Sequence, residues 1–149
     1  MFLSLEWGFT TRESAEIPSA LLSAVDLTGP IDGVLLIKRT GVSLAAWAKK
    51  PVAFDVITVM SATLLGSVDM IVQSLGGPSP QTMLVDVEGR RIFATKVDSQ
   101  LALVLLSVRG VGESFLRQEA QRLIAKISAT KANQRHKRSE KASPTRSVR

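Results

Sequence analysis

The sequence predicts one α/β (α+β) domain in which a five-stranded, mostly antiparallel sheet is flanked by helices. Three observations carry this prediction: two segments patterned as hairpins, an uncharged helical segment between them, and a further helical segment near the C-terminus. The expected order of elements is α-β-β-α-β-β-β-α. Hairpins place sequence neighbours side by side in one sheet, and helices then cover the apolar faces of that sheet.

The N-terminal part of the chain predicts two elements. Residues 1–11 alternate apolar and polar side chains, with Trp7 and Phe9 among the apolar ones, which predicts an edge strand or a flap over the core. A first helix is expected over residues 17–27, with Pro18 near its first turn, where a missing N–H costs little. The Thr-Gly-Pro sequence that follows ends this helix.

The first hairpin is expected to comprise residues 31–37 and 42–47. Its first strand is a nearly continuous apolar run, and the Lys-Arg-Thr-Gly segment between the strands is typical of a turn. Gly33 within the first strand indicates a bulge or a close approach of another backbone segment.

Residues 54–75 predict the central helix, which the Gly-Gly-Pro sequence after it ends. One face at helical spacing is apolar, and we expect this face to pack on the sheet. Its members are Phe54, Ile57, Ser61, Leu64, Leu65, Val68, Ile71, Val72 and Leu75.

The second half of the chain predicts another hairpin, from residues 82–87 and 91–96 with a turn that includes Glu88 and Gly89. A fifth strand follows over residues 101–108. A last helix is expected over residues 112–128. We therefore place the folded domain in residues 1–130.

The positive charge of the chain lies in its C-terminal segment. Residues 131–149 contain seven Lys and Arg against one Glu, whereas residues 1–130 carry equal numbers of acidic and basic side chains. The segment has no periodic apolar residues, which predicts a disordered basic tail. The tail either solubilises the chain or contacts an anionic membrane or nucleic acid. Candidate polyanion-binding residues are Lys131, Arg135, Lys137, Arg138 and Lys141.

The sequence lacks the usual residues of an active site. It contains no cysteine, and its one histidine, His136, lies in the basic tail, where a solvated role is the ordinary interpretation. Gly110 and Gly112 do not have the spacing of a phosphate-binding loop. Arg109 is a weak candidate for an arginine finger supplied in trans. We expect no enzymatic activity, no metal and no cofactor.

The outer face of the central helix also lacks charge, although a face in contact with water normally carries it. The helix is expected to be covered on both sides, outwardly either by a second subunit or partner or by the N-terminal segment with Trp7 and Phe9. The interface candidates are Val59, Met60, Thr63, Ser67, Met70 and Ser74.

Two segments resemble the Roadblock/dynein light chain family, whose fold is profilin-like: IDGVLLIKRTGVSLA, similar to the first hairpin of the family, and LALVLLSVRGVGESFLRQEAQRLIAKI, similar to its last strand and closing helix. The resemblance extends over about residues 17–127. Thr40 departs from it, since the family often has an acidic residue there. The resemblance implies a homodimer or heterodimer with sheets joined edge to edge, and partnership with small Ras-like GTPases.

Two functions are consistent with these features. The first is a dimeric protein-binding module that regulates or docks a small Ras-like GTPase. The second is a structural adaptor tethered to membrane or nucleic acid by its basic tail.

The N-terminus has no early basic residue and no cleavage site typical of a signal peptide. The longest uncharged apolar run of the central helix, residues 56–68, is shorter than the ~20 residues of a spanning helix. A cytoplasmic location is therefore expected.

Overall fold

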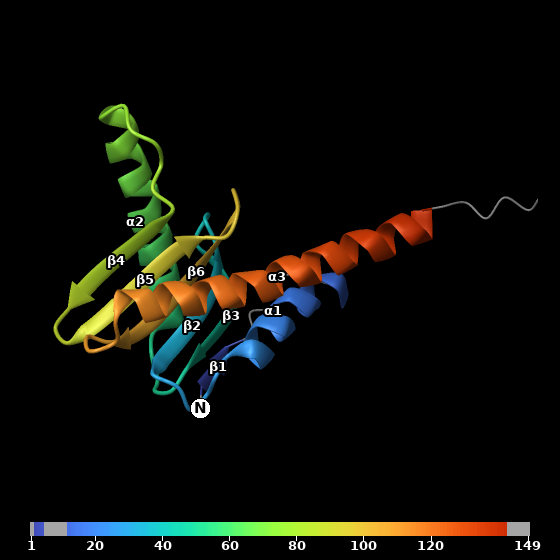
Figure 1. The fold of residues 1–149 in the computed structure, drawn as a ribbon, viewed down its shortest axis with the longest axis horizontal. Helices are drawn as coiled ribbons and strands as arrows, with labels where there is room; N and C mark the ends of the chain where they lie inside the picture. Colours follow the sequence, from blue (N-terminus) through green and yellow to red (C-terminus); the bar gives the residue numbers. More distant parts are fainter. Residues whose placement is uncertain (1, 5–11, 143–149) are drawn as a thin grey trace, which may run out of the picture.

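The computed structural model describes residues 2–4 and 12–142 (Figure 1). The order of elements expected from the sequence is confirmed, and a short strand precedes it at the N-terminus. The elements are β1 (Phe2–Ser4), α1 (Arg12–Ala24), β2 (Ile31–Lys38), β3 (Val42–Ala48), α2 (Phe54–Ser74), β4 (Thr82–Val87), β5 (Arg90–Lys96), β6 (Leu101–Val108) and α3 (Glu113–Ala142).

The strands form one sheet in the order β1-β3-β2-β6-β5-β4, and every neighbouring pair is antiparallel. The two predicted hairpins, β2–β3 and β4–β5, meet through β6, which pairs with β2 on one side and with β5 on the other. Leu35 lies opposite Val104 at the centre of the β2–β6 pair. Segments far apart in the sequence therefore form the middle of the sheet.

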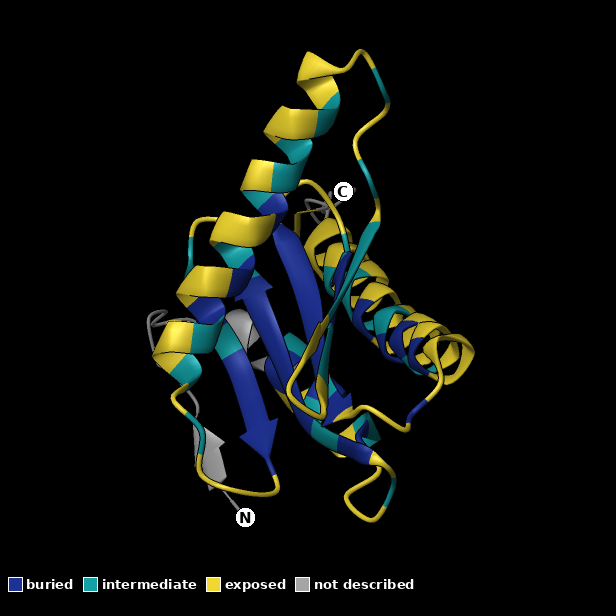
Figure 2. Ribbon diagram, turned by 90° about the vertical axis from the view of Figure 1, so that its left-hand side faces the viewer, coloured by how far each residue is buried: buried dark blue, intermediate teal, exposed yellow. Residues whose placement is uncertain are grey.

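Both faces of the sheet carry apolar side chains, because β2 is apolar throughout Val34–Ile37 and β6 is apolar at every position except Ser107. On one face, Leu36, Leu103 and Phe93 belong to the larger core cluster, which α1 and α3 cover. On the other face, Leu35 and Val104 belong to the smaller cluster beneath α2. The helices thus lie in two layers, with α1 and α3 together and α2 opposite them (Figures 1 and 2).

The N-terminal alternation predicted an edge strand or a flap. Residues 2–4 form an edge strand, β1, which pairs with Ala46–Ala48 of β3. Trp7 and Phe9 lie outside the described residues.

The first helix, α1, begins at Arg12, earlier than expected, so Pro18 lies inside it and is buried. The packing of Leu21 and Val25 in the core offsets the hydrogen bond that Pro18 removes.

The last helix is longer than the sequence analysis allowed. α3 continues to Ala142, so the prediction of a disordered tail from residue 131 is wrong for residues 131–142; residues 143–149 lie outside the described part. The buried residues of α3 end at Ile127. Extending an existing helix is far easier than nucleating one, and Ala, Gln, Lys and Arg are good helix formers. Lys131 also forms an ion pair with Asp98, and His136 Nε2 lies 3.2 Å from Glu140 Oε1.

Gly33 of β2 has the close backbone approach that its place in a strand indicated. A Cβ atom added there would lie 3.0 Å from Leu106 Cδ1 and 3.2 Å from the carbonyl oxygen of Trp47. The register of β2 against β6 also shifts between Ile31 and Gly33. Glycine at this position therefore lets the three central strands pack without displacement.

We predict that Gly33→Ala destabilises the fold by roughly 1–2 kcal/mol, since the extra methyl group overpacks a buried position. Urea unfolding followed by circular dichroism would measure the change. Gly110→Ala is the matched control, because a Cβ atom at Gly110 would meet nothing within 4 Å. Equal midpoints for both variants and the wild type would contradict the prediction.

Candidate partner-binding surface

One side of α2 is uncharged and exposed along the length of the helix (Figure 2). All six interface residues predicted from the sequence lie on it. We call this face the α2 surface; it consists of Val56, Val59, Met60, Thr63, Leu64, Ser67, Met70, Ile71, Ser74 and Leu75. Its large apolar members are well exposed: Met60 by 54%, Met70 by 71% and Leu75 by 81%.

Three residues of the α2 surface contradict the predicted core face of the helix. Leu64, Ile71 and Leu75 were expected to pack on the sheet, yet all three are exposed. The buried residues of α2, Thr58, Ser61 and Leu65, all lie in its first twelve residues. The second half of α2 projects past the sheet, as Figure 2 shows, so its apolar side chains have no strand to cover them.

Two of the hydroxyl groups on the α2 surface, those of Thr63 and Ser74, are satisfied within the helix. Thr63 Oγ1 donates a hydrogen bond to the carbonyl oxygen of Val59 at 2.8 Å, and Ser74 Oγ donates to that of Met70 at 2.8 Å. A hydroxyl group bound in this way does not need a partner across an interface. The small side chains of Thr63 and Ser74 therefore leave room for close packing without adding an unmet polar group.

By length and composition α2 could also cross a membrane. Its two ends, however, lead into β3 and β4 of the same sheet, and its first half packs on that sheet. The same composition arises when one side of a helix packs on its own domain and the other side meets another protein. α2 is therefore a helix of the folded domain, with one side packed on the sheet and the other side exposed.

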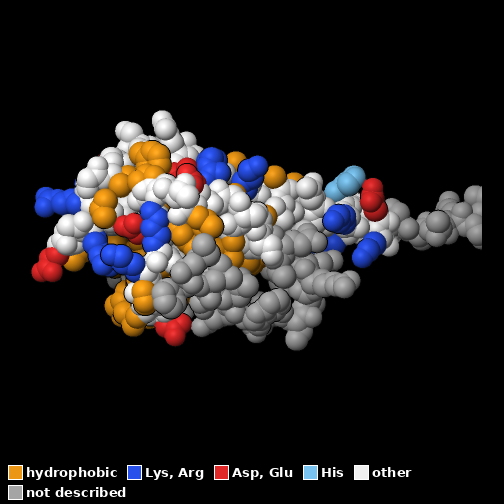
Figure 3. Space-filling view, turned by 90° about the horizontal axis from the view of Figure 1, so that it is seen from below, with side chains coloured by type: hydrophobic (Ala, Val, Ile, Leu, Met, Phe, Trp, Pro, Cys, Tyr) orange, Lys and Arg blue, Asp and Glu red, His pale blue; other side chains and the backbone are white. Residues whose placement is uncertain are grey.

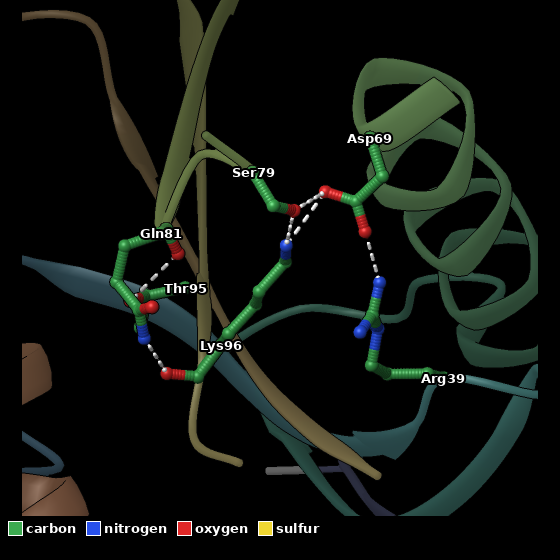
Figure 4. A network of polar contacts seen from close by, with 6 residues as sticks. All are labelled: Arg39, Asp69, Ser79, Gln81, Thr95 and Lys96. Atoms are coloured by element: carbon green, nitrogen blue, oxygen red, sulfur yellow. Dashed lines mark hydrogen bonds and ion pairs between the residues drawn. The ribbon is translucent and has the colours of Figure 1, made fainter. Parts of the chain in front are cut away.

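A cluster of polar contacts holds the projecting half of α2 in place (Figure 4). Lys96 of β5 donates from Nζ to Asp69 Oδ1 at 2.6 Å, and Arg39 of the β2–β3 turn pairs with Asp69 Oδ2. Ser79 donates its hydroxyl hydrogen to Asp69 Oδ1 and accepts a hydrogen bond from Lys96 at 2.6 Å. Asp69 thus joins α2 to two separate places on the sheet.

Sequence reasoning missed the cluster around Asp69. An isolated carboxylate in an otherwise uncharged helical stretch was the available signal. Its two basic partners, Arg39 and Lys96, come from 30 residues before and 27 residues after it, so no local pattern could identify them.

The surroundings of Asp69 favour its charged form. Hydrogen bonds from Lys96 and Ser79, with a further one from Arg39, outweigh partial burial and lower the pKa of Asp69 from 3.8 to about 2. A carboxylate whose pKa is depressed in the folded state stabilises that state above the unfolded pKa. This contribution is lost as the pH falls from about 4 to about 2.

We predict that Asp69→Asn lowers the free energy of unfolding by roughly 1–2 kcal/mol at pH 7, because it leaves Lys96 without its counter-ion. The difference from the wild type should shrink as the pH falls from about 4 to about 2, where the wild-type carboxylate becomes protonated. Denaturant unfolding at several pH values would measure both effects. Asp55→Asn, at an exposed position of the same helix, is the control. A difference that stays constant with pH would contradict the assignment.

The predicted polyanion-binding residues lie on the last part of α3 rather than on a tail. Lys131 is half-buried and paired with Asp98. The other four, Arg135, Lys137, Arg138 and Lys141, are on exposed helical positions, and Figure 3 shows basic side chains around the histidine at that end. Arg109, the weak arginine-finger candidate, is exposed in the turn before α3 and bonds through its backbone N–H to Gly89 of the β4–β5 turn.

Comparison with known proteins identifies the fold. A family model described as the Roadblock/LC7 domain matches residues 19–107. A Roadblock/LC7 domain from Streptomyces avermitilis is 15% identical, with a TM-score of 0.66 over 75% of this chain and 94% of that one. MglB from Myxococcus xanthus is 13% identical, with a TM-score of 0.68 over 85% and 93%. A profilin from Schizosaccharomyces pombe is 15% identical, with a TM-score of 0.51 over 78% and 96%. A search of curated protein sequences finds no match.

Proposed function

The chain belongs to the Roadblock/LC7 domain family, and from this premise we propose that it is a dimeric, cytoplasmic protein-binding module that regulates or docks a small Ras-like GTPase. The observation that carries the proposal is the α2 surface. Exposed apolar patches larger than a few hundred Å² usually mark interaction sites. The proposal assigns the chain no catalytic residue and no cofactor, since a binding module needs neither.

The sheet offers two edges for joining a second copy, and their positions relative to α2 differ. α2 packs against β2 and β3, at the end of the sheet opposite β4. Joining two copies at the β3 edge would therefore bring the two α2 surfaces close together, whereas joining them at β4 would not. β1 pairs with Ala46–Ala48 only, which leaves Val42–Ala45 as the unpaired part of that edge among the described residues. We favour dimerisation at this edge, with α2 packed beside its counterpart.

A GTPase is a suitable partner for such a dimer because of what its switch segments do. These segments become ordered around the γ-phosphate and are released after hydrolysis, so a surface that fixes them changes the behaviour of the GTPase without supplying a chemical group. The parts of the α2 surface that the second copy leaves uncovered are where we place this contact. Met60, Thr63 and Ser67 are its proposed centre, and Met70 is assigned to the contact between the two copies.

We predict that Met70→Asp weakens self-association on the order of a hundredfold, because the dimer would bury an unpaired carboxylate. Sedimentation velocity of the full chain at micromolar concentrations would measure the change. The matched control is Gln73→Asp, which adds the same charge at an exposed position of α2 outside the α2 surface. Wild-type protein that sediments as a monomer, or two variants that dissociate equally, would refute dimerisation through this surface.

The second prediction concerns the partner. The cognate Ras-like GTPase, loaded with GDP or with a non-hydrolysable GTP analogue, is titrated against the purified chain by calorimetry. A higher affinity for one nucleotide state would support regulation, and equal affinity would support docking. Met60→Asp should weaken binding by roughly tenfold or more, whereas Gln73→Asp should leave it within about twofold.

Absence of binding in both nucleotide states, with both proteins folded, would instead favour the alternative function. In that case the chain is a structural adaptor, and the basic end of α3 is its contact with an anionic membrane or nucleic acid. The exposed positions of Arg135, Lys137 and Lys141 support this second candidate.

A further inference from the structure

A groove of about 480 Å³ opens at the end of the sheet where β3 and β6 end. It lies between the start of α2 and the β4–β5 turn. Ile57 of α2, Ile92 of β5 and Leu106 of β6 form its apolar floor. None of the residues that line the groove belongs to the α2 surface, so the groove is a separate feature of the molecule.

The groove exists because α2 covers only part of its face of the sheet. The helix packs on β2 and β3, while Ile92 and Leu106 on the neighbouring strands remain half-buried. At the open end of the groove, Val87 and Val108 are exposed by 49% and 51%. The floor therefore offers apolar area that a bound side chain would remove from water, at roughly 25 cal/mol per Å².

The rim of the groove carries basic side chains, and they differ in whether they are paired. Lys49 lies 3.8 Å from Asp32, and Arg91 binds Asp86 through two hydrogen bonds of 2.7 and 3.0 Å. Lys50 and Arg90 are exposed and form no ion pair within the described part of the chain. Figure 3 looks onto this end of the molecule and shows basic side chains next to hydrophobic ones.

We propose that this groove binds an acidic peptide segment of a partner protein, with an apolar side chain on the floor and carboxylates at Lys50 and Arg90. Charge complementarity selects the acidic segment, since Lys50 and Arg90, the two lining basic side chains without an ion pair among the described residues, outnumber the one such acidic side chain, Glu88. A nucleic acid is a poor fit because no aromatic side chain lines the groove for base stacking. A small inorganic anion would leave the apolar floor in contact with water.

The energetics indicate which part of the segment supplies affinity and which supplies selectivity. Ion pairs at exposed positions such as Lys50 and Arg90 contribute roughly 0–1 kcal/mol each and weaken with salt. Burial of the apolar side chain supplies the larger part of the binding free energy. Binding should therefore need both the apolar and the acidic residues of the segment.

Fluorescence anisotropy of the full chain with three labelled peptides tests the proposal. The peptides alternate leucine with aspartate, serine with aspartate, and leucine with lysine. We expect the leucine–aspartate peptide to bind, and the other two to bind at least roughly tenfold more weakly. Equal binding of the serine–aspartate peptide would show a purely electrostatic contact and overturn the proposal, as would no binding of the leucine–aspartate peptide.

Variants then locate the binding site. The double variant Lys50→Glu, Arg90→Glu should weaken binding of the leucine–aspartate peptide by roughly tenfold or more. The matched control, Arg135→Glu with Lys137→Glu, changes the net charge equally but acts at the far end of α3. Equal loss in both double variants would place binding elsewhere and refute the groove. Lys50→Gln with Arg90→Gln repeats the test without charge reversal, should the first variant misfold.

A competition experiment separates a peptide from a lipid. Displacement of the bound leucine–aspartate peptide by laurate at equal concentration would identify an acyl carboxylate as the better ligand and overturn the peptide assignment. Retention of the peptide would support it.

Discussion

The antiparallel pairing of β2 with β6 is the interaction on which the rest of the structure depends. It joins the two hairpins, which are separated by α2 in the sequence, into one sheet. Consecutive residues of both strands are apolar at the centre of the sheet, so the sheet has two faces that must be removed from water. The helices then divide between these faces, and their lengths decide what remains exposed. Gly33 permits the close packing of β2 against its neighbours that this arrangement needs.

The two faces of the sheet are covered unequally, and both the α2 surface and the groove follow from this. α1 and α3 together cover the first face over the larger core cluster. α2 alone covers the second face. The helix is longer than the strands beneath it, so its second half projects past the sheet. It is also narrower than this face, so β5 and β6 remain half-covered at one end. The first mismatch leaves the α2 surface, and the second leaves the groove. Asp69 keeps the projecting half aligned through its contacts with Arg39 and Lys96.

Local patterns in the sequence predicted the order of the elements. They also predicted the boundaries of the five strands from β2 to β6 within one residue, because hairpin and helix periodicities are local properties. They also placed the six interface candidates on the exposed side of α2.

The sequence patterns failed where the outcome depends on how far one element extends past another. Leu64, Ile71 and Leu75 have the spacing of core residues, yet only the length of the strands beneath them decides whether they are buried. The Asp69 cluster and the groove are likewise formed by residues distant in sequence. For residues 131–142, composition alone indicated disorder, and the extension of a helix already anchored by packing outweighed it.

The length of α3 changes what its basic end can do. A helix rises 1.5 Å per residue, so the 30 residues of α3 span about 45 Å, of which the part after Thr130 accounts for about 18 Å. A flexible chain would spread its charges over a volume and meet an anionic surface in any orientation. A rod tied to the body through Lys131 and Asp98 presents Arg135, Lys137 and Lys141 at a set reach and direction from the sheet. An anionic surface that engages this rod would therefore also orient the whole domain, and with it the direction in which α2 faces.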